Sequence, residues 1–405
     1  MRYIAGHMNN LNRRDLLRLL PAAALASTGS VVAQNAHGNA QDANSPLTET
    51  VAHAQRPPKE VRGIWIHPER YFSADPVEGK KQVRSLVQRF ARANFNLLLP
   101  WTTSAYLVAL DSSVYQEKHP TAAWDALGVL IEEAAREGID VDLWYSFTDY
   151  RQPDSPEFNP LVGGNPQWSA KRLDEVVPDT KTGKLAEPRH DNVCPLYAPA
   201  RIWQKALLTK TLQRYAKVHG LHIEEPGYRQ RGYCLCDLCR KVYGELHSRD
   251  LTVDLDSSEA EDFRTIGTSA FMSEMRDELL KNFPRVVYSA NGGPDWRHDR
   301  KRGRDWGRWA LSGWLQYYAS QVYEPRLSDF REQLRLTMND IGKACSVYAG
   351  IALDWSTGKN TVPGVIEDIE AARSLGCPGL LFFHGTVFTD QVCDALRAGP
   401  FKRPA

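Results

Sequence analysis

The sequence predicts an α/β fold, a (β/α)8 or TIM barrel with long loops after its third and fourth strands. From residue 61 onward, short runs of aliphatic, β-branched and aromatic residues alternate with amphipathic segments, which is the pattern of repeated βα units. Two connections that follow strands, residues 148–199 and 226–260, are much longer than the others. In this fold such loops lie at the C-terminal ends of the strands, where active sites are built.

Eight apolar runs give the expected strands, and the segments between them have helical spacing. Val83, Leu86, Val87 and Phe90 recur at i, i+3, i+4 and i+7, as on one face of an amphipathic helix. A doubly wound open sheet is the alternative, but no Gly-x-Gly-x-x-Gly follows the first strand. We expect strands at residues 61–67, 96–101, 141–147, 221–225, 286–291, 315–323, 346–355 and 379–384.

The N-terminal residues have the features of an export signal. Arg13 and Arg14 precede a short apolar run and a stretch of small residues that ends at Ala33, as in a twin-arginine signal peptide. We expect a signal peptide at residues 1–33, recognised by the twin-arginine export machinery, then a flexible linker at 34–60 and the barrel domain at 61–400. The mature protein would then be periplasmic or secreted. A basic tail or a short anchor helix is the alternative.

The composition argues against two classes of partner. Fifty basic and 49 acidic residues among 405 leave a formal net charge of +1, so no overall field favours nucleic acid or an anionic membrane surface. After the signal segment, no apolar run reaches the length of a bilayer-spanning helix. We therefore expect no nucleic-acid partner and no membrane span in the mature protein.

The expected strands end in carboxylates, an amide, imidazoles and aromatic rings. Cleavage of a glycosidic bond needs one carboxyl group to protonate the leaving oxygen and another to act as nucleophile or base, and aromatic faces stack on sugars. For each single residue, a place on a solvated barrel rim is the alternative. The candidate catalytic residues are Glu225, Glu224, Asp354 and Glu324. The candidate substrate-binding residues are His67, Trp101, Trp144, Asn291, Tyr323, Trp355 and His384.

The fourth strand ends in two adjacent acids, Glu224 and Glu225, followed by Pro226. Two carboxylates at the end of an apolar strand are costly to bury unless they are paired, protonated or used in catalysis. Ile223 suits the side of the strand that faces the helices, so alternation sends Glu224 toward the barrel axis. Pro226 ends the strand, which lets Glu225 turn into the barrel mouth.

Three parts of the sequence, residues 61–66, residues 220–228 and the region of the seventh and eighth strands, resemble the family 10-like glycosyl hydrolases. The resemblance covers nearly all of the chain after the linker and implies a barrel glycosidase. The segment 224–226 is also similar to the Asn-Glu-Pro that ends the fourth strand in the retaining clan of barrel glycosidases. That similarity implies Glu225 as the acid/base, with Glu224 as the first alternative. It implies Asp354 as the nucleophile, with Glu324 as its rival.

Four of the seven cysteines form a pattern typical of metal binding. Cys234, Cys236 and Cys239 follow the fourth strand closely, and Cys194 lies in the long connection after the third. Such a set fits Zn²⁺ held tetrahedrally by thiolates, with disulfides or free thiols as alternatives. A twin-arginine substrate folds before export, in a reducing compartment, which favours metal. The similarity to the four-cysteine site of a family of barrel β-galactosidases implies that the zinc is structural. We expect buried side chains at Cys345, Cys377 and Cys393.

Residues 295–309 are rich in arginine and tryptophan. At the barrel mouth, forked guanidinium contacts and ring stacking would bind an acidic sugar such as a uronate. The alternative is a solvated loop and helix start.

Together these features predict an exported glycoside hydrolase that cleaves O-glycosidic bonds of a poly- or oligosaccharide through paired carboxylates. Two other classes stay open. A non-catalytic carbohydrate-binding or cell-wall barrel would keep the aromatic residues but needs no perturbed carboxyl group. A zinc-dependent hydrolase would use the cysteine site to cleave an amide or ester.

Overall fold

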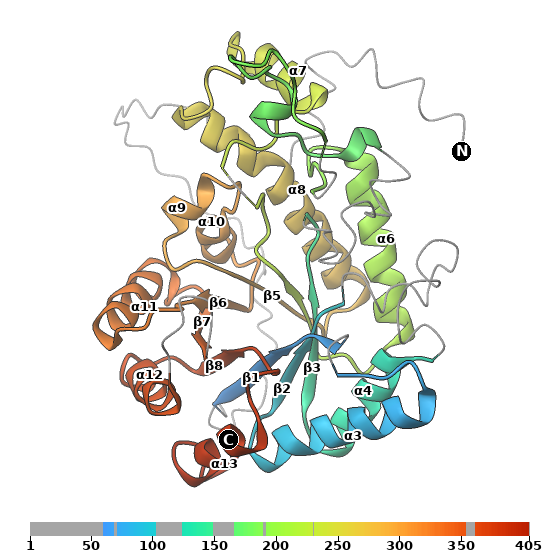
Figure 1. Ribbon diagram of the computed structural model, residues 1–405, viewed down its shortest axis with the longest axis vertical. Coiled ribbons are helices and arrows are strands. Elements are labelled where there is room, and N and C mark those ends of the chain that lie inside the picture. The colour runs from blue at the N-terminus through green and yellow to red at the C-terminus, as the bar shows by residue number, and fades with distance from the viewer. Residues whose placement is uncertain are drawn as a thin grey trace, which may run out of the picture. The chain divides into compact units, whose positions relative to one another are not determined.

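The apolar runs form eight parallel strands that close into one barrel (Figure 1). Each strand pairs with its neighbours in the sequence, and the last strand pairs with the first to close the barrel. This order confirms the predicted (β/α)8 fold. The strands are β1 Val61–Ile66, β2 Leu97–Pro100, β3 Asp140–Tyr145, β4 Gly220–Ile223, β5 Val287–Gly292, β6 Tyr317–Gln321, β7 Ser346–Ala352 and β8 Gly379–Phe383.

The computed structural model describes residues 60–68, 71–102, 124–148, 166–188, 192–229, 231–353 and 361–404. The predicted signal peptide at 1–33 lies outside these ranges, as do the predicted linker up to residue 59 and the candidates Asp354 and Trp355. Residues from Glu60 onward belong to one compact unit. Within the described ranges, no helix combines the length and the apolar character needed to cross a membrane.

Alternation along the strands separates an inner core from an outer one. On β4, Ile223 packs into the outer core between the strands and the helices, whereas His222 contacts the rings of Trp65 and Tyr317 inside the barrel. The same alternation directs Glu224 inward, as the sequence predicts. The inner core consists of Trp65, Leu97, Leu99, Trp144, Tyr317, Ala319 and Leu381.

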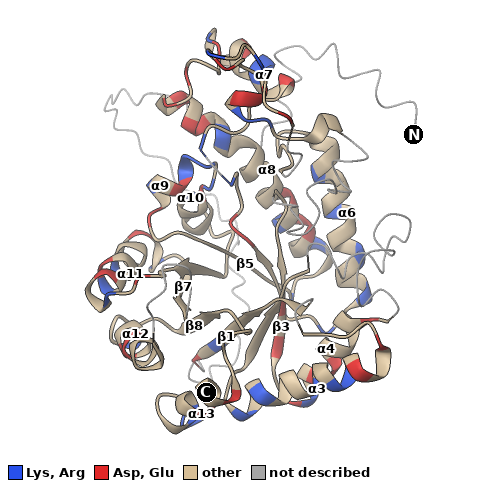
Figure 2. Cartoon of the chain, viewed as in Figure 1, with Lys and Arg blue, Asp and Glu red and all other residues tan. Residues whose placement is uncertain are grey.

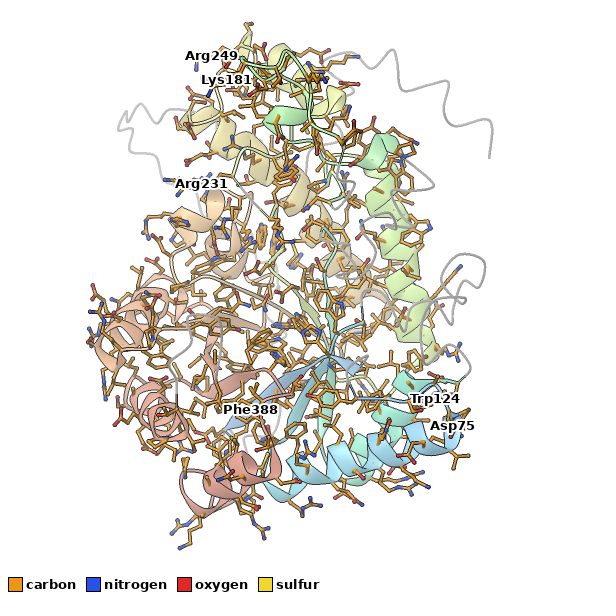
Figure 3. The ribbon with its side chains drawn as sticks, in the orientation of Figure 1. Asp75, Trp124, Lys181, Arg231, Arg249 and Phe388 are labelled. Carbon is orange, nitrogen blue, oxygen red and sulfur yellow. The ribbon has the colours of Figure 1, made fainter. Side chains whose placement is uncertain are left out.

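The connecting helices bury one face against the strands and carry most of the charged residues on the other (Figure 2). They include α3 Pro76–Arg92, α4 Ala126–Arg136, α6 Ala198–Arg214, α8 Ser258–Asn282, α9 Trp296–Arg300, α10 Trp306–Leu311, α11 Leu327–Ile341, α12 Val362–Ser374 and α13 Asp390–Ala398. α3 buries the face that its spacing predicts, and the Asp75 side chain caps its first turn. Trp124 packs beside this helix start, where its indole donates to the Ser73 carbonyl at 3.2 Å (Figure 3).

The connections after β3 and β4 are long, as predicted, and the one after β4 is partly helical. The first runs from the end of β3 to α6 and contains two short 3-10 helices, η4 Pro166–Trp168 and η5 Leu173–Glu175. The second runs from β4 to α8 and contains α7 Asp237–His247 (Figure 1). α7 begins directly after Cys236, so one turn of helix sets the spacing between Cys236 and Cys239.

A hydrogen-bonded network fills the lower interior of the barrel, below the strand ends that carry the candidate residues. Asp142 on β3 is fully buried, and its two oxygens lie 2.7 Å from His219 Nδ1 and 2.7 Å from the Tyr317 hydroxyl. His222 Nδ1 lies 2.8 Å from Ser289 Oγ. Burial lowers the pKa of His222 to about 3, so this ring is neutral. The lower interior is thus polar, and its side chains bond to one another.

Candidate active site

Glu224 stands at the end of β4, fixed by the strands on both sides. Its backbone N–H donates to the Tyr145 carbonyl at 2.8 Å, which continues the ladder from β3. Its Oε2 accepts a hydrogen bond from Trp144 Nε1 at 2.5 Å and another from Asn291 Nδ2 at 2.6 Å. Trp144 comes from β3 and Asn291 from β5, so the carboxyl group is held by the two neighbours of its own strand.

The environment of Glu224 favours its protonated form. Burial and, as a smaller contribution, the nearby Glu225 carboxylate raise the pKa of Glu224 to about 8, although the bonds from Asn291 and Trp144 and the charge of Arg304 act in the opposite direction. Both direct donors are uncharged, so they supply much less compensation than a cation would. At neutral pH this carboxyl group therefore keeps its proton.

Glu225 has a different environment from its neighbour. Its φ of 36° lies in the left-handed region, which costs a non-glycine residue about 1–3 kcal/mol and recurs at functional sites. Its backbone N–H donates to Asn291 Oδ1 at 2.7 Å, and its Oε2 accepts from Arg304 Nη2 at 2.7 Å. The side chain is 36% exposed. One amide, that of Asn291, thus contacts both acids.

Arg304 is the partner of Glu225, and strand-end reasoning missed it. Its side chain is only 3% exposed, and its Nη1 lies 3.9 Å from Asp299 Oδ1. Burial alone would lower the pKa of Arg304, but Glu225, Asp299 and Glu224 outweigh burial and raise it. Asp299 is held in turn by Trp306 Nε1 at 3.0 Å. The arginine-rich pattern of residues 295–309 was the signal that pointed to this segment.

A wall of aromatic rings stands beside Glu224. The Trp101 and Trp144 ring centroids are 4.5 Å apart in an edge-to-face arrangement. His67 lies 5.1 Å from Trp144 and 5.5 Å from His384, also edge-to-face. Phe383, which the sequence interpretation overlooked, contacts both Trp144 and His67. Such a wall presents ring faces and edges of the kind that pack against sugars.

The predicted substrate-binding residues therefore largely converge. His67, Trp101, Trp144 and His384 form the aromatic wall, Asn291 bonds to Glu224, and Tyr323 stacks on Phe383 with centroids 5.7 Å apart. Phe383 could have been found from alternation on β8, because it shares the inward face of Leu381. Trp355 lies outside the described residues.

Glu324 and Asp354 were the candidates for a second catalytic carboxylate. Glu324 follows β6, and its Oε1 accepts from Gln333 Nε2 on α11 at 2.6 Å. Within the described ranges, no hydrogen bond or ion pair joins Glu324 to Glu224 or Glu225. Asp354 lies outside those ranges.

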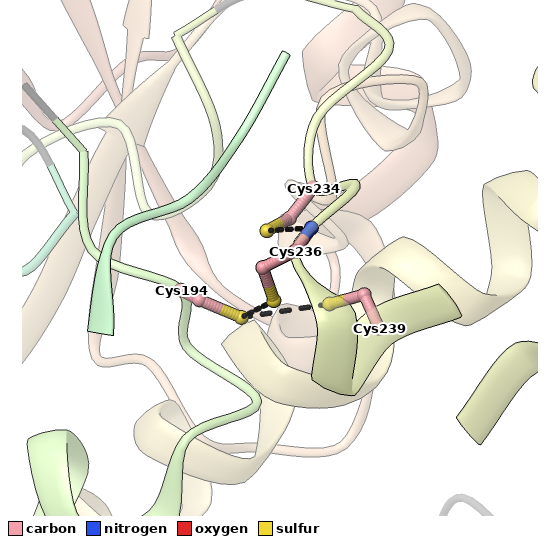
Figure 4. A group of neighbouring side chains, drawn as sticks. All are labelled: Cys194, Cys234, Cys236 and Cys239. Carbon is pink, nitrogen blue, oxygen red and sulfur yellow. Dashed lines mark hydrogen bonds between the residues drawn. The ribbon is translucent and has the colours of Figure 1, made fainter. Parts of the chain in front are cut away.

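The four cysteines of the predicted metal site come together, all buried (Figure 4). Their sulfur atoms lie within 4.8 Å of one another. Cys194 Sγ lies 3.5 Å from Cys239 Sγ and 3.7 Å from Cys236 Sγ. The cluster links the connection after β3 to the connection after β4, and its four soft donors could hold a metal ion. Cys345, Cys377 and Cys393 are buried, as expected.

Most of the arginines in residues 295–309 bond to acids of the protein itself. Arg297 pairs with Asp340 at 2.8 Å, and Arg308 pairs with Asp305 at 3.4 Å. Arg300 bonds to Asp262, and Arg304 bonds to Glu225. These ion pairs favour the structural alternative for this segment, since their guanidinium groups are already engaged.

A hollow of about 750 Å³ is lined by residues between 172 and 186 together with Arg231 and Gly232. Aliphatic, polar and charged side chains line it, among them Leu173, Leu185 and Lys184. No aromatic ring is among the described residues that line it, so the ring faces suited to sugars lie at the barrel mouth instead.

Known proteins share this architecture. The glycoside hydrolase domain of PgaB (BpsB) from Bordetella bronchiseptica matches with a TM-score of 0.61 and 13% identity, over 83% of this chain and 98% of that one. Alpha-L-fucosidase isoenzyme 2 from Paenibacillus thiaminolyticus matches with a TM-score of 0.53 and 16% identity, over 84% of this chain and 48% of that one. These likenesses show the shared barrel fold.

Sequence comparison adds the family. None of the curated proteins matches the chain. A family model described as Glycosyl hydrolase-like 10 matches residues 60–354, from the first strand past the end of the seventh. Because this match covers most of the sequence, the chain belongs to the glycosyl hydrolase-like 10 family.

Proposed function

We propose that the protein is an exported glycoside hydrolase that cleaves O-glycosidic bonds of a poly- or oligosaccharide, with Glu224 as its general acid. The observation that carries the proposal is the buried Glu224 carboxyl group, fixed by Trp144 and Asn291 beside an aromatic wall, where burial is the main cause that raises its pKa to about 8. A general acid needs a proton to give at the working pH. Membership of a glycosyl hydrolase-like family supports the same reaction class.

The surroundings of the two acids favour the reverse of the order that the resemblance implies, with Glu224 before Glu225. Glu225 forms an ion pair with Arg304, whose Nη2 lies 2.7 Å from Glu225 Oε2. Glu224 has uncharged donors and a raised pKa. We therefore assign proton donation to the glycosidic oxygen to Glu224, and Glu225 becomes the alternative.

The second carboxylate would act as nucleophile or base on the other side of the sugar. Asp354 and Glu324 remain the candidates. A carboxyl separation of about 5–5.5 Å would give retaining chemistry, and roughly 6.5–9.5 Å would give inverting chemistry. Trp101, Trp144, His67 and His384 would hold the sugar ring through stacking and edge contacts.

Glu224→Gln is the direct test of the acid. The amide oxygen can still accept from Trp144 and Asn291, so the fold should persist while the transferable proton is lost. We expect turnover of a panel of aryl glycosides and polysaccharide fragments to fall by about 10²–10⁴-fold. Glu225→Gln tests the alternative acid, Glu324→Gln tests one candidate for the second carboxylate, and Glu367→Gln, at an exposed position of α12, is the matched control. Sugar binding without turnover in both wild type and Glu224→Gln would instead identify a non-catalytic carbohydrate-binding barrel.

We further propose that the four cysteines hold a structural Zn²⁺. Four thiolates complete a tetrahedral zinc site and leave no position for a reactive water, which argues against a zinc hydrolase. When bound, the ion would pin the two long connections to each other. The stacked rings of Tyr228 and Tyr233, with centroids 6.1 Å apart, connect the cysteine segment to the residues that follow Glu225.

Metal analysis and chelation test this zinc site. We expect about one zinc per chain, lost in Cys239→Ser, and we expect chelation to lower the melting temperature and expose residues 166–188 to protease. A Cys393→Ser variant is the matched control. Cys393 is also buried, but it belongs to α13 and is not one of the four clustered cysteines. Loss of turnover after chelation with an unchanged melting temperature would support the zinc-dependent hydrolase.

Two finer points of the proposal rest on the sequence alone. Export through the twin-arginine machinery to the periplasm or beyond rests on residues 1–33, and cell fractionation of a variant with Arg13→Lys and Arg14→Lys tests it. An acidic substrate rests on residues 295–309, whose internal ion pairs give it little support. Comparing neutral oligosaccharides with uronate-containing ones tests that point.

A further inference from the structure

Three acidic side chains and one guanidinium form a cluster at the barrel mouth. Arg304 bonds to Glu225 at 2.7 Å and lies 3.9 Å from Asp299. Asn291 joins Glu225 to Glu224, because its amide accepts from the backbone of one and donates to the carboxyl group of the other. With all three acids ionised, the cluster would carry two uncompensated negative charges in a largely buried space. At least one of the acids is therefore expected to hold a proton; burial raises the pKa of Glu224 and that of Asp299, and Arg304 opposes the rise at both.

Tyrosine and histidine side chains face this cluster from other elements. Tyr318 on β6 and Tyr323 just after β6 face it, and burial holds the pKa of both hydroxyl groups well above the usual range. His222 lies one step deeper on β4 and is neutral, and His67 packs on the ring of Trp144. In the described part of the chain, Arg304 is the one arginine or lysine that the cluster contacts.

We propose that Glu225, held in place by Arg304, is a fixed negative charge that keeps the proton on Glu224, which makes Arg304 a positioning residue. This inference rests on the proposed role of Glu224 as the acid. A negative charge beside a buried carboxyl group disfavours a second ionisation, and a guanidinium partner selects which of two neighbours ionises. Adjacent acids with unlike charge states are the arrangement that acid catalysis requires.

The backbone around Arg304 keeps its side chain in one place. A Cβ atom on Gly227 would lie 2.3 Å from Arg304 Cγ, so only glycine lets the two segments approach this closely. Gly303 has a φ of 75°, and its carbonyl accepts from the Thr268 hydroxyl at 2.5 Å. Because Arg304 is almost completely buried, it acts through Glu225 and not by touching substrate.

The test measures the titration of Glu224 without any substrate. The indole N–H of Trp144 donates to Glu224, so its NMR resonance reports the protonation of that carboxyl group; Trp144→Phe assigns it among the 11 tryptophans. In wild type we expect a midpoint near pH 8. In Glu225→Gln we expect the midpoint to fall by about one pH unit or more. In Glu367→Gln, the matched control at an exposed position of α12, the midpoint should not move.

The Arg304 variants test the positioning role. Arg304→Lys keeps the charge and should leave the midpoint close to that of wild type, although the forked geometry is lost. Arg304→Met removes a cation that opposes the proton on Glu224, and it also releases Glu225. It should therefore raise the midpoint by less in the wild-type background than the same substitution does in Glu225→Gln. If the Arg304→Met protein does not fold, the double variant with Arg304→Met and Glu225→Gln removes both partners of the ion pair. The Glu224 midpoint of this double variant should be higher than that of Glu225→Gln. A merely structural arginine would alter stability and leave the midpoint unchanged.

The outcomes separate this inference from the proposed function. An unmoved midpoint in Glu225→Gln overturns the inference, even if wild type cleaves glycosides and Glu224→Gln does not. A midpoint that falls as expected in a protein that cleaves no glycoside supports the inference and removes the proposed function. When turnover is found, the alkaline limb of kcat/KM should shift in the same direction as the Trp144 resonance.

Discussion

Two carboxyl groups lie inside the same barrel, one above the other, and their partners differ. Asp142, in the lower interior, is fully buried between His219 and the Tyr317 hydroxyl, each 2.7 Å from one of its oxygens. Glu224, at the mouth, accepts from the uncharged N–H groups of Trp144 and Asn291 and, among the described residues, from no other donor; an acid is its neighbour in the chain. Asp142 thus has a hydrogen-bond partner, His219, that can become a cation. The two hydrogen-bond partners of Glu224 cannot.

The difference separates stability from function along the barrel axis. A buried carboxylate with a histidine and a hydroxyl partner is satisfied, and its removal damages the fold. A buried carboxyl group with a raised pKa costs stability whenever it ionises, and proteins keep such groups where chemistry needs them. This matches the general division of (β/α)8 barrels, in which the C-terminal face carries catalysis and the opposite face carries stability.

The largest expected effect is on the free energy of unfolding, when Asp142 and Glu224 are each replaced by the corresponding amide. We expect Asp142→Asn to lower the free energy of unfolding by about 1–3 kcal/mol, because the amide cannot accept at both ends. We expect Glu224→Gln to cause no loss. Urea unfolding of both variants at pH 6 to 8 measures their free energies of unfolding. If both substitutions lowered the free energy of unfolding equally, the assignment of stability to the lower interior and of function to the mouth would be contradicted.

The same comparison predicts a pH dependence. The folded-state pKa of Glu224 is about 8, above its ordinary 4.5, so the folded state holds a proton that the unfolded state releases. Stability therefore falls as the pH rises from about 4.5 through 8. Glu224→Gln should remove that fall and be the more stable protein at pH 8.

A smaller effect is expected at His219, in the lower interior. Burial alone would lower the pKa of His219, but the hydrogen bond and charge of Asp142 outweigh it and raise the pKa. The protonated pair therefore stabilises the protein fully below the unfolded pKa of about 6.5, and this contribution is lost as the pH rises through the folded pKa. Because His219 is partly exposed, we expect about 1 kcal/mol or less.

His219→Gln in the Glu224→Gln background isolates this contribution. Wild type would mix two titrations of the same sign, whereas the Glu224→Gln background leaves only that of the histidine. The loss caused by His219→Gln should be present at pH 5.5 and absent at pH 9. A loss of equal size at both pH values would show that the ring contributes by packing and not by charge.

The sequence predicted the barrel and the inward direction of Glu224, because both follow from periodicity: apolar runs alternate with amphipathic helices, and Ile223 fixes the parity of its strand. It did not predict that Glu225 pairs with Arg304, 79 residues later, because that contact depends on where β5 and α9 carry the chain. The left-handed φ of Glu225 also leaves no pattern in the sequence. Phe383 was predictable and missed, since alternation on β8 places it beside Leu381.

The smallest expected effect is a shift of the Glu224 midpoint in Trp144→Phe. This variant distinguishes the effect of the hydrogen bonds to Glu224 from the effect of the neighbouring charge. The indole N–H bond to Glu224 opposes the rise of the carboxyl pKa. Trp144→Phe keeps a ring against Trp101 and His67 but removes this donor, so the Glu224 midpoint should rise by about half to one pH unit, the equivalent of one hydrogen bond of about 1 kcal/mol. The carboxyl infrared band, measured as a difference between Trp144→Phe and the double variant that also carries Glu224→Gln, reports this midpoint when the Trp144 indole is absent.

The shift of the Glu224 midpoint in Trp144→Phe should be opposite in sign to the shift in Glu225→Gln. A fall in the midpoint would mean that the indole stabilises the protonated acid, and the hydrogen bonds at the mouth would then act together with the neighbouring charge instead of against it.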